Sequence, residues 1–145
     1  MQNYALIVYL VCFALLIGVL VFGETVRGAT GWYVAGPLSF QPVEFMKIAL
    51  ILALSTYFAR RGKRVFDLRG FLESGAITCL PVAFVLLQPD FGSASILVGI
   101  WAFYLLYAGI PWRYVIALVV AGTGLFFLAW NVFFADYQRS RILTF

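Results

Sequence analysis

The chain alternates long apolar stretches with short polar segments. Apolar residues dominate five stretches, over 4–23, 42–59, 70–87, 92–109 and 113–134. Each is close to the roughly 20 residues that a helix needs to cross the hydrocarbon core of a bilayer. None of them shows the period-2 alternation that is typical of a transmembrane β-barrel. The pattern predicts an all-α fold, a polytopic membrane helical bundle of about five transmembrane helices that forms a single membrane domain over residues 1–145.

Composition supports the same class. Of the 145 residues, 64% are hydrophobic and only 11% are charged, whereas a soluble domain carries about 25% charged residues. A water-soluble domain of this size could not bury so much apolar surface, and a disordered chain would be far more polar. We therefore expect membrane lipids to surround the protein.

The basic residues predict an orientation. Five of the ten lie close together, at Arg60, Arg61, Lys63, Arg64 and Arg69. Cytoplasmic loops are enriched in Lys and Arg, so this segment is expected in the cytoplasm, as part of a multi-pass membrane protein. By parity the N-terminus is then cytoplasmic, and segments 24–41, 88–91 and 135–145 are external. Because the basic residues cluster in one loop, the net charge of +4 does not predict nucleic-acid binding.

Several kinds of active site are excluded by residue types. The chain has no His, so it can form neither a His-containing catalytic triad nor a His-bound metal centre. Its cysteines, Cys12 and Cys79, lie inside apolar stretches and are expected to act as small hydrophobic residues. The sequence therefore predicts no metal site and no certain cofactor.

Charged residues at the expected outer boundary are the main functional signal, because charges at membrane depth are costly. Glu44 follows Pro42 at the start of a predicted helix, where a carboxylate also interacts favourably with the helix dipole. Lys47 lies one turn deeper, on the same face as Glu44. We expect the pair to line an outward-opening cavity that attracts phosphate or pyrophosphate. Alternatively, Lys47 does not line a cavity, and its side chain extends along the helix to place the ammonium group at the membrane–water interface.

Four other polar or small-residue features have simpler interpretations. Asp90 is a candidate binding residue, and it is equally well explained as the N-cap of the next helix. Glu73 is expected in the first turn of its helix. Segment 28–32 is interpreted as a tight external turn followed by an aromatic anchor, Trp32. The small residues at 121–124 suit close contact between helices.

Four blocks of residues together resemble the RodA/FtsW/SpoVE family of bacterial shape, elongation, division and sporulation proteins, with a slight similarity to the RodA-like branch. In order, the blocks are Gly28-Ala29-x-x-Trp32, Phe40-Gln41-Pro42-x-Glu44-x-x-Lys47, Gln88-Pro89-Asp90-Phe91-Gly92-Ser93-Ala94 and Tyr137-Gln138-x-x-Arg141-Ile142. The resemblance departs from the family pattern at Val43, where members usually have Ser or Ala, and at Gly31, where they often have Arg.

The resemblance implies a ten-helix, multi-pass protein of the bacterial inner (plasma) membrane, of which this chain would cover about the third to seventh helices. It implies a peptidoglycan glycosyltransferase that polymerises lipid II with a class B penicillin-binding protein as partner. Glu44, Lys47 and Asp90 would bind the substrate, with the Glu44–Lys47 pair neutralising its pyrophosphate alone or with a divalent cation. The family's catalytic aspartate, a general base, would lie beyond Phe145. We therefore expect a partial copy that lacks the catalytic loop and does not polymerise lipid II alone.

Two other functions fit the same residues. A flippase or transporter of a lipid-linked precursor could also use charges that face a cavity, although transporters often place them near the bilayer midplane. A non-catalytic scaffold for a penicillin-binding protein could use the small residues at 121–124 for helix contact. Transfer of labelled lipid II across a liposome bilayer would indicate a flippase. Loss of the partner's localisation, together with a harmless Lys47→Ala substitution, would indicate a scaffold.

Overall fold

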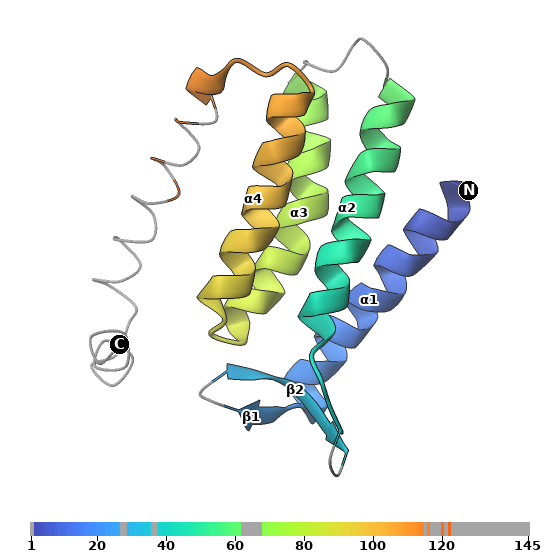
Figure 1. The fold of residues 1–145 in the computed structure, drawn as a ribbon, viewed down its shortest axis with the longest axis vertical. Coiled ribbons are helices and arrows are strands. Elements are labelled where there is room, and N and C mark those ends of the chain that lie inside the picture. Colours follow the sequence, from blue (N-terminus) through green and yellow to red (C-terminus); the bar gives the residue numbers. More distant parts are fainter. Residues whose placement is uncertain are drawn as a thin grey trace. The chain divides into compact units, whose positions relative to one another are not determined.

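The structure is a computed structural model that describes residues 2–26, 29–35, 38–61 and 68–114, together with residues 116, 120 and 122. The chain divides into two compact units, Met1–Gly109 and Ile110–Phe145. In the first unit, the elements follow the order α1 (Gln2–Phe22), β1 (Glu24–Val26), β2 (Ala29–Ala35), β3 (Leu38–Phe40), α2 (Pro42–Arg61), α3 (Leu68–Leu87) and α4 (Phe91–Tyr107). Figure 1 shows the four helices of this unit side by side.

The ends of the helices follow from local chemistry. Pro42 is the first residue of α2, a position where its missing N–H leaves no hydrogen bond unmade. Asp90 caps α4, because its side chain accepts the backbone N–H of Ser93. After α4, Gly109 adopts a φ of 82°, a left-handed conformation that ends many helices and favours glycine. The expectation that Asp90 is an N-cap is confirmed.

A small antiparallel sheet lies at one end of the helices (Figure 1). Its strand order is β1-β2-β3, with Thr25 opposite Thr30 and Val34 opposite Ser39. We call this end, where α1 ends, α2 begins and α3 turns into α4, the sheet end, and the opposite end the loop end. The interpretation of 28–32 as a tight turn was wrong for residues 29–32, which belong to strand β2.

Strand β2 is attached to the helices as well as to its neighbouring strands. It contacts α1 and α2, and the Tyr33 hydroxyl donates a hydrogen bond to the Leu15 carbonyl of α1 at 3.2 Å. The sheet therefore fixes the backbone between α1 and α2 over the start of α2.

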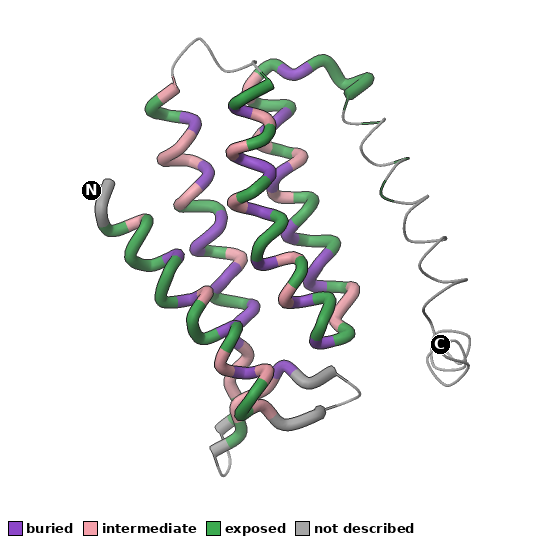
Figure 2. Tube along the Cα trace, turned by 180° about the vertical axis from the view of Figure 1, so that it is seen from behind, coloured by how far each residue is buried: buried purple, intermediate pink, exposed green. Residues whose placement is uncertain are grey.

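The buried residues form a core between the helices, seen as purple segments that face one another in Figure 2. Fully buried side chains come from all four helices and include Leu16, Met46, Leu50, Val85 and Leu97. The outward surfaces are equally apolar, since Leu6, Leu10 and Phe103 are all more than half exposed. A protein that is apolar on both sides of its helices is suited to a hydrocarbon solvent.

Length and composition agree with membrane insertion. Within the described residues, three helices are long and apolar enough to cross a membrane, over Tyr4–Phe22, Pro42–Arg61 and Leu68–Leu87. Helix α4 is shorter, with 17 residues. The expected fifth span, 113–134, lies outside the described residues except for positions 113, 114, 116, 120 and 122, as does the expected external segment 135–145.

Candidate functional site at the sheet end

Glu44 and Lys47 form an ion pair near the start of α2. Lys47 Nζ lies 2.8 Å from Glu44 Oε1. The Lys47 side chain is only 17% exposed, whereas that of Glu44 is 55% exposed. A lysine ammonium has three N–H donors, and Glu44 accepts one of them. The pair is therefore charge-compensated, with the carboxylate more accessible than the ammonium group.

Asp90 lies at the same end of the helices and interacts with two elements. Its Oδ1 accepts the backbone N–H of Ser93 at 2.9 Å. Its Oδ2 accepts a hydrogen bond from Gln41 Nε2 at 3.3 Å, from the residue that precedes α2. Asp90 is thus both a helix cap and a link between the start of α4 and the start of α2.

Two glutamines at the sheet end, Gln41 and Gln88, occur in the sequence blocks but received no role of their own there. Gln88 is almost completely buried, at 1% exposure, and its Nε2 donates to the Leu16 carbonyl of α1 at 3.2 Å. A buried amide directly after an apolar helix is the signal in the sequence that could have identified it, because a buried polar group needs a partner.

The cavity expected beside the Glu44–Lys47 pair stays a prediction. Two hollows on the described part of the first unit lie between α2 and α4. One of about 580 Å³ is lined by Phe58, Tyr104 and Tyr107 among others, and one of about 460 Å³ by Ile51, Ile96 and their neighbours. Neither is lined by Glu44, Lys47 or Asp90.

The donor set at the sheet end does not favour a bound cation. Among the described residues, no group of three or more Asp, Glu or Cys side chains could hold a metal ion. The Glu44 carboxylate also already interacts with Lys47, so a cation bound there would have to compete with that ion pair. We assign no step to a divalent cation.

Some residues expected on this side of the membrane cannot be placed. The side chain of Glu24 lies outside the described part of the chain, although its backbone pairs with Trp32. Arg27, Asp136, Arg139 and Arg141 also lie outside it. Glu44, Lys47 and Asp90 are therefore the charged side chains that the structure describes at the sheet end.

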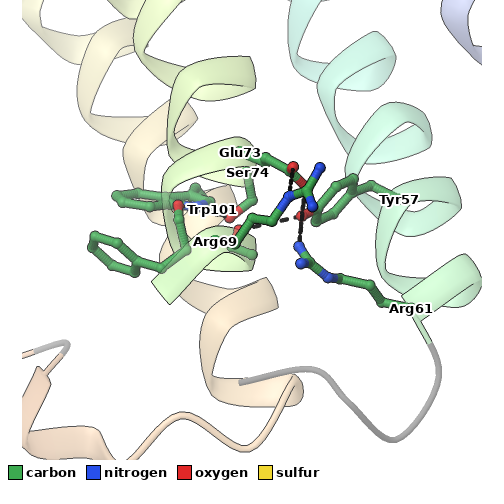
Figure 3. Close-up of polar contacts among 8 residues, drawn as sticks. Tyr57, Arg61, Arg69, Glu73, Ser74 and Trp101 are labelled. Atoms are coloured by element: carbon green, nitrogen blue, oxygen red, sulfur yellow. Dashed lines mark hydrogen bonds and ion pairs between the residues drawn. The ribbon is translucent and has the colours of Figure 1, made fainter. Parts of the chain in front are cut away.

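A second polar cluster occupies the loop end (Figure 3). The Glu73 carboxylate accepts hydrogen bonds from Tyr57 Oη at 2.8 Å, Arg61 at 3.1 Å and Arg69 Nε at 2.7 Å. Arg61 also donates to the Tyr57 hydroxyl. The expectation that Glu73 lies in the first turn of its helix was wrong, since α3 begins at Leu68. The carboxylate instead joins the end of α2 to the start of α3.

Comparison with known proteins gives a consistent result. The whole chain, residues 1–145, matches the family model FTSW_RODA_SPOVE, described as cell cycle protein. A curated relative, the peptidoglycan glycosyltransferase RodA of Treponema pallidum, is 40% identical over 86% of this chain and 29% of its own length. The chain spans about a third of the length of the curated relatives it matches.

Solved structures show the same similarity. The chain matches a structure described as the structural coordination of polymerization and crosslinking by a peptidoglycan synthase complex, with a TM-score of 0.77 and 34% identity over 98% of this chain and 42% of the other. It also matches the rod shape determining protein RodA of Thermus thermophilus, with a TM-score of 0.70 and 34% identity, over 86% of this chain and 41% of that one.

Proposed function

Because the chain belongs to the FtsW/RodA/SpoVE family of cell cycle proteins, we propose that it is part of a peptidoglycan glycosyltransferase that polymerises lipid II. The observation that carries the proposal is the grouping of Glu44, Lys47 and Asp90 at the sheet end, joined through Gln41. These residues belong to the blocks by which the sequence resembles the family. A curated relative is named a peptidoglycan glycosyltransferase.

We propose that the sheet end faces outward and the loop end the cytoplasm. The basic residues near the loop end, Arg60, Arg61 and Arg69 among them, support this orientation through the enrichment of Lys and Arg in cytoplasmic loops. Lipid II would then meet Glu44, Lys47 and Asp90 from the outer leaflet. The protein would work in the bacterial plasma membrane with a class B penicillin-binding protein, in line with the match to a peptidoglycan synthase complex.

In this mechanism Lys47 stabilises the pyrophosphate leaving group. As the acceptor oxygen bonds to the anomeric carbon of the donor sugar, the bond from that carbon to the pyrophosphate breaks and its electron pair leaves with the pyrophosphate. An ammonium group held at low exposure interacts strongly with the negative charge that accumulates there. Glu44 holds the ammonium group in place through the 2.8 Å contact. The general base that takes the proton of the acceptor hydroxyl would come from beyond Phe145.

The test uses the full gene product, purified with its partner and supplied with lipid II. Lys47→Ala is expected to lower polymerisation by about 100-fold or more, the usual effect of removing one group that stabilises transition-state charge. Ile48→Ala, on the next residue of α2 and 58% exposed, is the matched control and should retain activity. Full glycan-chain synthesis by Lys47→Ala would contradict the role of Lys47, and transfer of lipid II across liposomes without polymer would indicate a flippase.

A further inference from the structure

Gln41 connects the Glu44–Lys47 pair to Asp90 by an unbroken series of hydrogen bonds. Its backbone carbonyl accepts the N–H of Glu44 at 3.2 Å, within the first turn of α2. Its side-chain amide donates to Asp90 Oδ2 at 3.3 Å. The same residue therefore contacts both halves of the candidate site, one through its main chain and the other through its side chain.

The hydrogen bond from Gln41 sets the orientation of the Asp90 carboxylate. Oδ1 is held by the cap to Ser93 N at 2.9 Å. A carboxylate held at one oxygen can still rotate about its terminal torsion, which is broad for Asp. The second bond, to Oδ2, removes that freedom, so that the plane of the carboxylate is fixed relative to α2 as well as to α4.

Strand β2 passes beside the side chains of Gln41 and Gln88. Gly31 of strand β2 is buried, and a Cβ built there would lie 3.1 Å from Gln88 Oε1 and 3.9 Å from Gln41 Nε2. The strand backbone therefore approaches the Gln88 amide closely because residue 31 has no side chain, and it lies at ordinary contact distance from Gln41. Gln88 is itself fixed to α1 through the Leu16 carbonyl. The two glutamines thus lie where four parts of the fold meet: α1, β2, the start of α2 and the α3–α4 turn.

We propose that Gln41 is a positioning residue of the glycosyltransferase site, which holds the Asp90 carboxylate in one orientation relative to Glu44 and Lys47. The inference rests on the proposed function. Without Gln41 the cap to Ser93 still holds Asp90 at the start of α4, and Lys47, the group that attracts the pyrophosphate, is unchanged, so substrate binding is retained. The fixed orientation of the Asp90 carboxylate relative to Glu44 and Lys47 is lost, and small displacements of groups in an active site lower the rate of reaction steeply.

The test compares Gln41→Leu, Asp90→Asn and the double variant in the full gene product, with lipid II as substrate. Gln41→Leu keeps the size of the side chain and removes its donor. It should lower kcat roughly tenfold or more and change KM less than twofold. Because Gln41 acts through Asp90, the double variant should be no less active than Asp90→Asn alone. Non-additivity of this kind identifies residues that act together.

Ser95→Ala is the matched control. The Ser95 hydroxyl donates to the Gly92 carbonyl at 2.7 Å in the first turn of α4, so its loss should leave kcat unchanged. Unchanged kcat in Gln41→Leu, or losses that multiply in the double variant, would overturn the positioning role while Lys47→Ala still abolishes polymerisation. A wild-type protein that does not polymerise lipid II would instead contradict the proposed function itself.

Discussion

At the scale of single residues, small side chains decide how closely two helices approach. Gly75 of α3 faces Trp101 of α4, and a Cβ built at Gly75 would lie 3.2 Å from the indole ring. The indole Nε1 donates to the neighbouring Ser74 hydroxyl at 3.0 Å, and both side chains are buried. The pair of small residues on α3 therefore forms the surface on which Trp101 packs.

This contact predicts opposite effects for two helical glycines. Gly75→Ala should destabilise the protein by about 1 kcal/mol, because overpacking against the rigid indole costs roughly 1–3 kcal/mol and the better helix propensity of Ala returns about 1 kcal/mol. Gly99→Ala meets no atom within 4 Å and should stabilise α4 slightly. Thermal unfolding in detergent checks both, and equal shifts in the two variants would show that Trp101 does not restrict residue 75.

Residue-scale features were predictable from the sequence only where they are local. The capping role of Asp90 follows from its position before an apolar run, and the Glu44–Lys47 contact from a spacing of one turn. The hydrogen bond between Gln41 and Asp90 joins residues 49 positions apart. Their proximity depends on how α2 and α4 pack, which no local pattern encodes.

At the scale of elements, the cluster around Glu73 holds α2 and α3 together at the loop end. One carboxylate accepts hydrogen bonds from Tyr57 and Arg61 of α2 and from Arg69 of its own helix. The Glu73 side chain is 41% exposed and that of Arg69 81% exposed, so solvent weakens these ion pairs. The contribution of the cluster should therefore depend on ionic strength.

Replacing Glu73 tests this contribution. Glu73→Ala removes the acceptor that Arg61, Arg69 and Tyr57 share and leaves two like charges near each other, so the Tm should fall. High salt should reduce the difference from the wild-type protein, since it screens exposed charges. Arg60→Ala is the control, because Arg60 is exposed and lies at the end of α2, next to Arg61. A Tm difference that is independent of salt would indicate that the hydrogen bond to Tyr57, and not the ion pairs, carries the effect.

Elements differ in how well the sequence predicted them. The apolar stretches predicted helices because a membrane segment must satisfy its backbone hydrogen bonds internally. The sheet was missed, since β1 and β3 have three residues each and the glycines at 28 and 31 resemble a turn. The inward faces were also not predictable, because α1 exposes Leu6 and buries Leu16. The lipid-facing and core-facing sides of a membrane helix carry the same apolar residue types, so the sequence shows no 3.6-residue periodicity that would identify the inward face.

At the scale of the whole molecule, the proposed orientation leads to a prediction about labelling. In a variant whose natural cysteines, Cys12 and Cys79, are replaced by Ala, a single cysteine is introduced at Ser39→Cys or Leu68→Cys. Both positions are exposed, the first in β3 at the sheet end and the second at the start of α3 at the loop end.

If the loop end is cytoplasmic, as its basic residues indicate, a membrane-impermeant maleimide applied to intact spheroplasts should label only the Ser39→Cys variant. The Leu68→Cys variant should react after permeabilisation, which shows that its thiol is accessible. The reverse pattern would place Glu44, Lys47 and Asp90 on the cytoplasmic side, where they could not meet a substrate polymerised at the outer face.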